Sequence, residues 1–344
     1  MCPDSHTCTL GGLGALAWGI GSTEGEHAVA TQTLVVKRPR RMQVRIDGRL
    51  PHGVTAKDMA LALMARFGVS GGKGCAVEFS GRAVTSLDVE SRMTLCNLSV
   101  EFGAWTGIVA PDETTFEWVQ GRPFAPQGAA FDAGVRHWRT LASDDDAAWD
   151  ETLSLDVSNL TPQVSWGTSP DQTTGVDGWV PRPSSITDAA RRAAMERALS
   201  YMDLTPGTPL RGTPIDAVFI GSCTNGRLSD LRMAAAILKG RKVASGVKAL
   251  VVPGSMQIRA AAEAEGLDRV FTEAGFEWRK SDCSLCFYAG GDNFGAARRV
   301  ISSTNRNFEG RQGPGVRTHL ASPATVAASA IAGRIEDPRA ALHT

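Results

Sequence analysis

Three cysteines have the spacing that most strongly indicates metal chemistry in this sequence. Cys283 and Cys286 form a Cys-x-x-Cys pair, whose two thiols can reach one metal centre. Cys223 lies within residues 220–226 (Ile-Gly-Ser-Cys-Thr-Asn-Gly), between a predicted strand and a predicted helix. In open α/β sheets, ligands bind at such a turn, at the carboxyl end of a strand. Helix N-terminal amides near this turn favour an anionic thiolate–sulfide cluster.

Three kinds of site fit these cysteines. A structural zinc site needs a fourth ligand, and His319 is the plausible histidine in this half of the chain. A redox disulfide is disfavoured, because the pair does not begin a helix after a first strand. A [4Fe–4S] cluster with three thiolates leaves one iron free to bind substrate as a Lewis acid. On spacing alone, zinc and the cluster are about level.

Two arginines, Arg306 and Arg311, lie in the Gly- and Asn-rich residues 303–311 (Ser-Thr-Asn-Arg-Asn-Phe-Glu-Gly-Arg). Planar guanidinium groups bind carboxylates through paired hydrogen bonds. The segment is therefore a candidate substrate-binding loop. The alternative is a surface loop whose arginines are solvated, which is the usual environment of this side chain.

Acidic, hydroxyl and imidazole side chains provide candidates for proton transfer. Asp4, Ser5 and His6 are consecutive, although an exposed terminus would have the same sequence. Glu78 lies between two apolar residues of a predicted strand. A buried carboxylate usually has a partner, whereas on an edge strand Glu78 would face solvent.

Taken together, these segments resemble the aconitase superfamily of hydro-lyases, and within it the large subunits of the isopropylmalate dehydratases. The similar segments run in order over essentially the whole chain, which makes the assignment specific. They are residues 4–7, 30–34, 53–58, 77–79, 92–97, 109–115, 162–167, 218–227, 251–255, 263–267, 283–286, 303–311 and 319–323. Chains of this family continue upstream of Asp4, so the resemblance implies that the usual N-terminal segment is lacking.

The resemblance implies an iron–sulfur site and a carboxylate site. Cys223, Cys283 and Cys286 would bind a [4Fe–4S] cluster, and Arg306 and Arg311 would hold the substrate carboxylates. An open iron can ligate a hydroxide leaving group. The arginines can stabilise the charge of a carboxylate next to the abstracted proton.

The resemblance also implies a group of residues that handle protons. His6 would pair with Glu78 near the substrate hydroxyl, and Asp4 and Ser5 would line the same pocket. A polarised histidine–glutamate pair can supply a proton to the departing hydroxide. We therefore expect His6, Glu78 and Asp4 to be catalytic, and Ser5 to contact the substrate.

The implied reaction is dehydration of 2-isopropylmalate to an alkene diacid, followed by rehydration to 3-isopropylmalate, in leucine biosynthesis. In this branch the swivelling domain with the proton-abstracting serine is a separate small subunit, so the resemblance implies a small-subunit partner. One alternative substrate class is a related alkylmalate, such as citramalate, homocitrate or a benzylmalate-like acid. A truncated, inactive paralogue and a structural-zinc protein are the non-enzymatic alternatives.

Composition disfavours several other classes of protein. The chain has 36 basic and 36 acidic residues, and this neutral balance argues against binding to nucleic acid or anionic membranes. Seven cysteines among 344 residues are too sparse for a disulfide framework, so we expect a reduced, cytoplasmic environment. No apolar run approaches membrane-spanning length, and the first residues do not resemble a signal peptide.

Apolar periodicity predicts the elements that position these residues. Residues 42–48 and 75–79 are predicted strands, and residues 56–67, capped by Thr55, have helical spacing. Residues 93–103 are predicted as a buried helix with few charges. In the C-terminal half, strands alternate with helices, as in a parallel, doubly wound sheet.

We expect an aconitase-like α/β fold of several domains with mainly parallel sheets and the cluster at their interface. Residues 1–45 would be a remnant of a first α/β domain, and residues 46–160 a second α/β domain. Residues 161–190, rich in Pro, Gly, Ser, Thr and Asp, would be a linker. Residues 191–344 would form a third α/β domain that carries the cluster cysteines.

Overall fold

The computed structural model describes residues 4–288 and 292–342. The chain divides into two compact units, of which the first contains residues 1–50 and 70–159 and the second residues 51–69 and 160–344. The second unit therefore includes a segment from within the first half of the sequence. In the part of the chain that the structure describes, none of the helices has the length and apolar character that crossing a bilayer requires.

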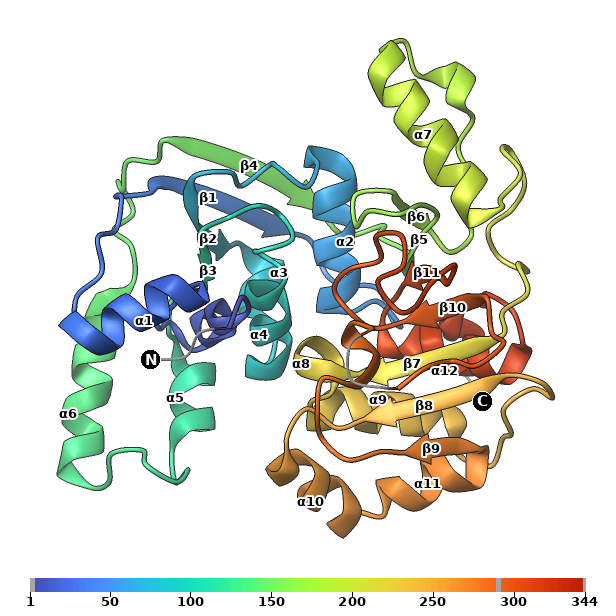
Figure 1. Ribbon diagram of the computed structural model, residues 1–344. Helices are drawn as coiled ribbons and strands as arrows, with labels where there is room; N and C mark the ends of the chain where they lie inside the picture. The colour runs from blue at the N-terminus through green and yellow to red at the C-terminus, as the bar shows by residue number, and fades with distance from the viewer. Residues whose placement is uncertain (1–3, 289–291, 343–344) are drawn as a thin grey trace. The chain divides into compact units, whose positions relative to one another are not determined.

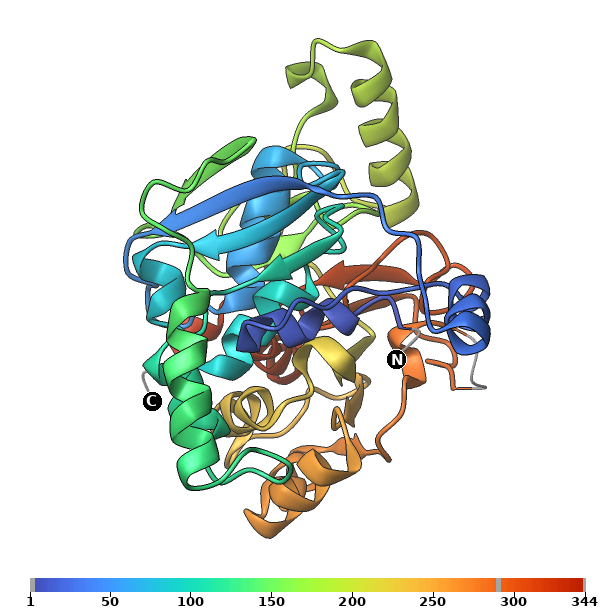
Figure 2. The same cartoon turned by 90° about the vertical axis from the view of Figure 1, so that its left-hand side faces the viewer.

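A four-stranded parallel sheet is the framework of the first unit (Figure 1). Its strands are β1 (Arg40–Asp47), β2 (Cys75–Ser80), β3 (Thr106–Ile108) and β4 (Glu151–Asp156), in the order β3-β2-β1-β4. The described helices of this unit are η1 (Thr7–Leu13), α1 (Ser22–Thr31), α3 (Arg82–Thr85), α4 (Val89–Asn97), α5 (Glu113–Val119), α6 (Ala129–Trp138) and η2 (Arg139–Leu141). Figure 2 shows the four strands side by side as one twisted sheet.

Buried side chains alternate with more exposed ones along β1 and β2, the two central strands of this sheet. Met42 and Val44 of β1 are fully buried, and so are Val77 and Phe79 of β2, within 2%. Successive side chains of a strand point to opposite faces. Glu78 therefore lies on the face of β2 opposite Val77 and Phe79, where it is half-buried.

Two glycines allow η1 to pack closely against its neighbours. A Cβ atom on Gly11 would lie 1.8 Å from the carbonyl oxygen of Gly107, and a Cβ atom on Gly12 would lie 2.5 Å from the backbone nitrogen of Met93. Both distances are shorter than non-bonded atoms tolerate. Because Gly11 and Gly12 have no side chains, η1 can pack directly against the backbone of Gly107 and Met93. This close packing holds η1 in place, together with the residues that immediately precede it.

A five-stranded parallel sheet is the framework of the second unit (Figure 1). Its strands are β7 (Ala217–Gly221), β8 (Lys248–Val252), β9 (Phe276–Trp278), β10 (Arg299–Ser302) and β11 (Arg317–Leu320), in the order β11-β10-β7-β8-β9. A small antiparallel sheet contains β5 (Gln163–Ser165) and β6 (Thr173–Gly175). The described helices are α2 (Ala56–Phe67), η3 (Pro183–Ser185), α7 (Ala189–Met202), α8 (Ser222–Asn225), α9 (Leu228–Leu238), α10 (Met256–Ala264), α11 (Leu267–Ala274), η4 (Ser284–Cys286), α12 (Pro323–Ala332) and η5 (Pro338–Ala341).

Both faces of the five-stranded sheet are buried. Val218 and Ile220 of β7 belong to a core cluster that includes apolar residues of α9, α11 and α12. Phe219 and Leu250, on the opposite face, cluster with Leu285. Strands that are apolar on both faces are typical of parallel sheets in α/β proteins. The predicted α/β class with mainly parallel sheets is confirmed.

The strand order of this sheet reverses beside β7. The chain passes from β7 to β8 and β9 on one side, and then returns to form β10 and β11 on the other. Connections leave the carboxyl ends of β7 and β10 in opposite directions, and ligands of α/β sheets bind at such a switch point. Residues 222–226 follow β7, and residues 303–311 follow β10.

Helix α2 has the bounds that the sequence predicts. Its N-cap, Thr55, forms a capping box with Asp58: the backbone N–H and the Oγ1 of Thr55 each donate to Asp58 Oδ2 at 2.8 Å. The predicted strands at residues 42–48 and 75–79 correspond to β1 and β2. The bounds of the helix predicted at residues 93–103 are wrong: α4 begins earlier, at Val89, and ends at Asn97, where hydrogen-bonded turns follow it.

Residues 161–190, predicted as a linker, include β5 and β6. Val164 and Val176 are fully buried in the main core cluster of the second unit. Although the composition of this stretch is mostly polar, some of its apolar residues pack into the core of the second unit. The division of the chain into four segments stays a prediction, since the structure resolves two compact units with a boundary between residues 159 and 160.

Candidate active site

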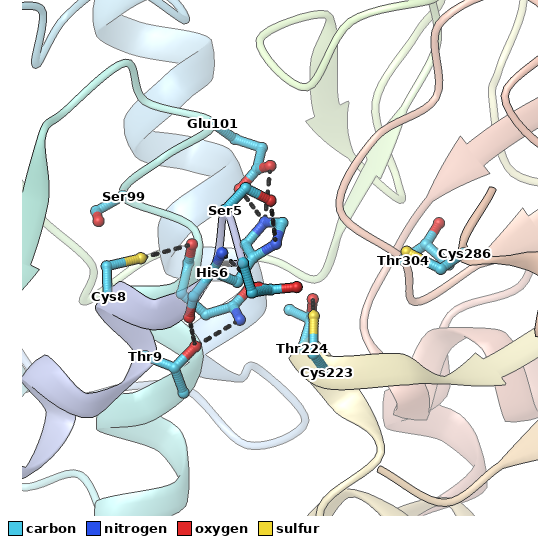
Figure 3. Close-up of polar contacts among 12 residues, drawn as sticks. Ser5, His6, Cys8, Thr9, Ser99, Glu101, Cys223, Thr224, Cys286 and Thr304 are labelled. Carbon is cyan, nitrogen blue, oxygen red and sulfur yellow. Dashed lines mark hydrogen bonds and ion pairs between the residues drawn. The ribbon is translucent and has the colours of Figure 1, made fainter. Parts of the chain in front are cut away.

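Cys223 lies in the turn that follows β7, within α8, and its side chain is exposed beside Thr224 (Figure 3). The turn depends on Gly221, which has a φ of +139° and where a Cβ atom would lie 2.1 Å from the carbonyl oxygen of Val252. Ser222 also has a positive φ, of 65°. Non-glycine residues rarely adopt this conformation, and it is concentrated at functional sites.

The Cys-x-x-Cys pair lies at η4, on a turn whose backbone is anchored. Cys283 is exposed and Cys286 is half-buried, whereas Leu285 between them is fully buried. Gln312 Nε2 donates a hydrogen bond to the carbonyl oxygen of Leu285 at 2.6 Å. The turn is thus held from inside the unit, while the two thiols remain accessible.

The chemistry of these donors fits an iron–sulfur cluster. Cys223, Cys283 and Cys286 are not joined in disulfides, and thiolates are the usual protein ligands of such clusters. The Oγ of Ser222 and the Nε of Arg311 are buried and have no hydrogen-bond partner. Buried polar atoms normally have partners, and a bound polar group at these two segments would provide them. In residues 4–288 and 292–342, no three His, Cys, Asp or Glu side chains are arranged to hold a metal ion, so the fit rests on donor chemistry.

His319 is not available as the fourth ligand of a structural zinc site. His319 is fully buried, with its Nδ1 2.6 Å from the carbonyl oxygen of Ser165 and its Nε2 3.0 Å from Nη1 of Arg299. Because the carbonyl accepts and the guanidinium donates, Nδ1 carries the proton and Nε2 accepts. Neither nitrogen is left for a metal. Burial lowers the pKa of His319 to about 3, which keeps the ring neutral.

The segment of Arg306 and Arg311 is anchored to neighbouring elements, which disfavours the alternative of a solvated surface loop. Asn307 is buried, and its Nδ2 donates to Ser165 Oγ at 3.1 Å. Arg306 and Arg311 are both half-buried. The guanidinium carbon of Arg311 lies 5.2 Å from the ring centroid of Phe287, a favourable cation–π distance.

His6 immediately precedes η1 and is almost completely buried. Its Nε2 lies 3.1 Å from Glu101 Oε1, and its Nδ1 lies 3.1 Å from Ser5 Oγ (Figure 3). Its backbone N–H donates to Asp4 Oδ1 at 2.7 Å. The structure thus brings the predicted Asp4, Ser5 and His6 together, and a buried carboxylate fixes the orientation of the imidazole.

The expected pair between His6 and Glu78 is wrong. Ser143 Oγ donates to Glu78 Oε2 at 2.6 Å, on the sheet face opposite the apolar side chains of β2. The carboxylate partner of His6 is Glu101. The sequence carried a signal for it, because Glu101 lies in an apolar run predicted to be buried, and a buried carboxylate needs a partner. A catalytic role for Glu78 now rests on the resemblance alone.

Comparison with known proteins decides the family. The family model for aconitase (aconitate hydratase) matches residues 1–333. The chain belongs to the aconitase family. It is 57% identical over 339 residues to 3-isopropylmalate dehydratase large subunit 1 of Bradyrhizobium diazoefficiens, covering 98% of this chain and 71% of that protein.

A second curated relative is consistent with that placement. The 3-isopropylmalate dehydratase large subunit of Roseiflexus castenholzii is 56% identical over 339 residues, covering 98% of this chain and 72% of that protein. The solved structure of Thermococcus kodakaraensis aconitase X is 11% identical with a TM-score of 0.38, covering 78% of this chain and 50% of that chain. The resemblance that the sequence motifs predicted is confirmed.

Proposed function

We propose that this aconitase-family chain is the large subunit of a 3-isopropylmalate dehydratase, which interconverts 2-isopropylmalate and 3-isopropylmalate by dehydration and rehydration. The observation that carries the proposal is the 57% identity over 98% of the chain to a large subunit of that enzyme. The local structure supports it, because Cys223 and the arginine segment follow the two strand ends at the switch point of the sheet.

A [4Fe–4S] cluster is the proposed cofactor, with Cys223, Cys283 and Cys286 as its protein ligands. When bound, the cluster supplies a Lewis-acidic iron that makes hydroxide a better leaving group. Arg311 Nη2 lies 3.8 Å from Cys286 Sγ. The guanidinium group of Arg311 therefore lies against the sulfur atom of one proposed cluster ligand.

Arg306 and Arg311 are proposed to bind the substrate carboxylates. Removal of a proton next to a carboxylate increases its negative charge, and guanidinium groups stabilise that charge. Arg311 lies 5.2 Å from the ring centroid of Phe287 and 5.3 Å from that of Phe308. These rings restrict the guanidinium group, so less side-chain entropy is lost when it binds an anion.

His6 is proposed to exchange the proton that joins or leaves the substrate oxygen. Glu101 accepts a hydrogen bond from Nε2–H, which leaves Nδ1, beside Ser5 Oγ, as the ring atom that exchanges the proton. In dehydration this proton joins the hydroxide and leaves as water. In rehydration a water returns the proton to the ring. Asp4 Oδ1 holds the backbone of His6 and keeps the ring in place.

A small subunit is the proposed partner. Both relatives are named large subunits, and the family resemblance assigns the swivelling domain with the proton-abstracting serine to a separate chain. The substrate class is a small dicarboxylate, which paired guanidinium groups are suited to bind.

Turnover with the partner tests the proposed function. The anaerobically reconstituted chain is mixed with a small subunit, and formation of the alkene diacid is followed by absorbance. The highest kcat/KM is expected with 2-isopropylmalate. A preference for citramalate, homocitrate or benzylmalate would reassign the substrate. Stoichiometric iron and acid-labile sulfide without turnover of any of these acids would instead support the inactive paralogue.

A further inference from the structure

Lys57 is a fully buried lysine in the first turn of α2. Its Nζ donates to the carbonyl oxygen of Ser303 at 3.0 Å and to that of Thr304 at 2.6 Å. Burying an ammonium group is costly unless hydrogen bonds compensate. The hydrogen bonds from Lys57 to two successive carbonyl groups compensate this cost, and they hold the backbone of residues 303 and 304 in one position.

The backbone that Lys57 binds joins the two strand ends of the switch point. The Ser303 N–H donates to the carbonyl oxygen of Phe219 at 3.0 Å, and the N–H of Gly221 donates to Ser303 Oγ at 3.0 Å. Ser303 is thereby fixed against the end of β7. The last residue of β7, Gly221, precedes Cys223 by two positions. Arg306 follows Thr304 after a single intervening residue.

Lys57 is itself held on a rigid support. The neighbouring Asp58 caps α2 through Thr55, and its Oδ1 accepts the backbone N–H of Gln163 at 2.7 Å. The same strand, β5, holds Asn307 through Ser165 Oγ. The N-terminus of α2 and Asn307 of the arginine segment are therefore both hydrogen-bonded to β5.

A trans peptide unit points its C=O and the following N–H in opposite directions. With the oxygens of Ser303 and Thr304 facing Lys57, the following amide groups face away from it. The orientation of the chain that enters Asn305 and Arg306 is thus set by the buried ammonium group. Its positive charge also adds to the potential that attracts an anion to this segment.

We propose that Lys57 is a positioning residue for substrate binding, which orients the segment that carries Arg306 and Arg311. This inference rests on the proposed function, because it takes these arginines as the carboxylate-binding groups. Lys57 acts through the carbonyl groups of Ser303 and Thr304, and it makes no contact with the substrate.

The test replaces Lys57 by methionine, which has a similar length but no charge and no donor. We expect the KM for 2-isopropylmalate to rise at least about tenfold, since a charged hydrogen bond that is lost inside a protein has effects of this order. The iron content should stay at the wild-type level. Leu63→Met, at another buried position of α2, is the matched control and should change neither value. An unchanged KM in a folded, cluster-containing Lys57→Met variant would overturn the inference.

Hydrogen exchange provides a readout that needs no substrate and separates this inference from the proposed function. Amides of residues 303–307 should exchange at least about tenfold faster in Lys57→Met than in the wild type, while those of β8 stay unchanged. Lys57→Gln keeps an uncharged amide donor group and serves if Lys57→Met does not fold, with an intermediate increase expected. Equal protection of residues 303–307 in wild type and variant would refute the role of Lys57, whereas a wild type without turnover would refute only the proposed function.

Discussion

Among single residues, the pair of His6 and Glu101 is the contact whose chemistry can be tested most directly. Glu101→Gln keeps the side-chain shape but removes the negative charge that faces His6 Nε2. We expect kcat to fall about 100-fold, the scale of general acid–base catalysis. Glu78→Gln is the matched control, because Glu78 bonds Ser143 instead, and it should change kcat less than about threefold. Similar losses in both variants would show that Glu78 also acts in the reaction.

Arg311 tests whether guanidinium geometry matters in addition to charge. Arg311→Lys keeps the charge but cannot form the planar fork that binds a carboxylate at two points. We expect kcat/KM to fall at least about tenfold, with a stability change of about 0.5–1 kcal/mol. Arg232→Lys, at an exposed ion pair with Glu265, is the control and should leave kcat/KM unchanged. A large loss of stability with unaltered kcat/KM would make Arg311 a structural residue.

Residue-level prediction from the sequence succeeded where the signal is local. The strand–turn–helix pattern around Cys223 is a property of a short segment, and the structure has it. The pairing of His6 depends on which buried carboxylate the tertiary structure brings near it, and no local pattern distinguishes Glu78 from Glu101. Glu101 differs from Glu78 in being almost completely buried, within an apolar stretch of the chain. That difference identifies Glu101 only after the burial of the stretch is known.

At the scale of elements, the close approach of η1 to its neighbours predicts a strong effect of a single methyl group. In Gly12→Ala the new Cβ atom would lie 2.5 Å from the backbone nitrogen of Met93, so η1 must shift. We expect destabilisation of about 1–3 kcal/mol in chemical denaturation, and a loss of activity because His6 moves with η1. Gly21→Ala is the control, since the nearest atom to its Cβ would be 3.8 Å away. Equal stability of both variants would contradict the packing described.

The buried histidine of β11 predicts how stability depends on pH. Burial lowers the pKa of His319 to about 3, whereas an unfolded histidine has a pKa near about 6.5. Below that value the unfolded chain binds a proton that the folded chain does not, so stability should fall as the pH decreases from about 6.5 towards 3, by up to about 1.4 kcal/mol per pH unit.

Denaturation of wild type and His319→Gln at several pH values measures this contribution. The variant should be less stable at neutral pH but should show a shallower acid-side slope. Burial raises the pKa of Asp58 to about 6, which gives the opposite slope, with stability lost as the pH rises from about 4 to 6. Asp58 is present in both proteins and therefore cancels in the comparison. Identical slopes would show that His319 does not stay neutral in the folded protein.

The elements also show why prediction from sequence succeeds for some segments and fails for others. Helix α2 has a capping box and regular apolar spacing, so its bounds follow from local rules. Residues 161–190 have the composition of a linker, yet Val164 and Val176 are buried. Their burial depends on partners far away in the sequence, including α12 and β7 in the same core cluster, and composition carries no information about such partners.

For the whole molecule, the chain order of the second unit has a consequence for folding. Residues 51–69 belong to this unit although the next part of it begins at residue 160. The contacts of Lys57 with Ser303 and of Asp58 with Gln163 span long stretches of sequence. Contacts of such separation slow folding, so we expect the segment that carries the proposed substrate arginines to reach its final position only when α2 has docked.

Cluster binding should therefore stabilise the second unit as a whole. Cys223 and Cys283 are separated by sixty residues and follow different strands, so a cluster bound to both would close a long loop and restrict the unfolded chain. Metal binding to preformed ligands adds its free energy to folding. Anaerobic reconstitution with iron and sulfide should raise the melting temperature of the unit by at least about 5 °C.

The cysteine variants identify the source of that increase. Cys283→Ser should abolish both the acid-labile sulfide and the rise in melting temperature, because two remaining thiolates cannot retain the cluster. Cys75→Ala, at a buried thiol of β2 in the first unit, should keep the full increase even if the apoprotein melts earlier. If zinc alone produced the same increase, without acid-labile sulfide, the cysteines would form a structural metal site and the chain would lack the group that its proposed dehydration requires. An increase that survives in Cys283→Ser would place the stabilising metal elsewhere in the molecule.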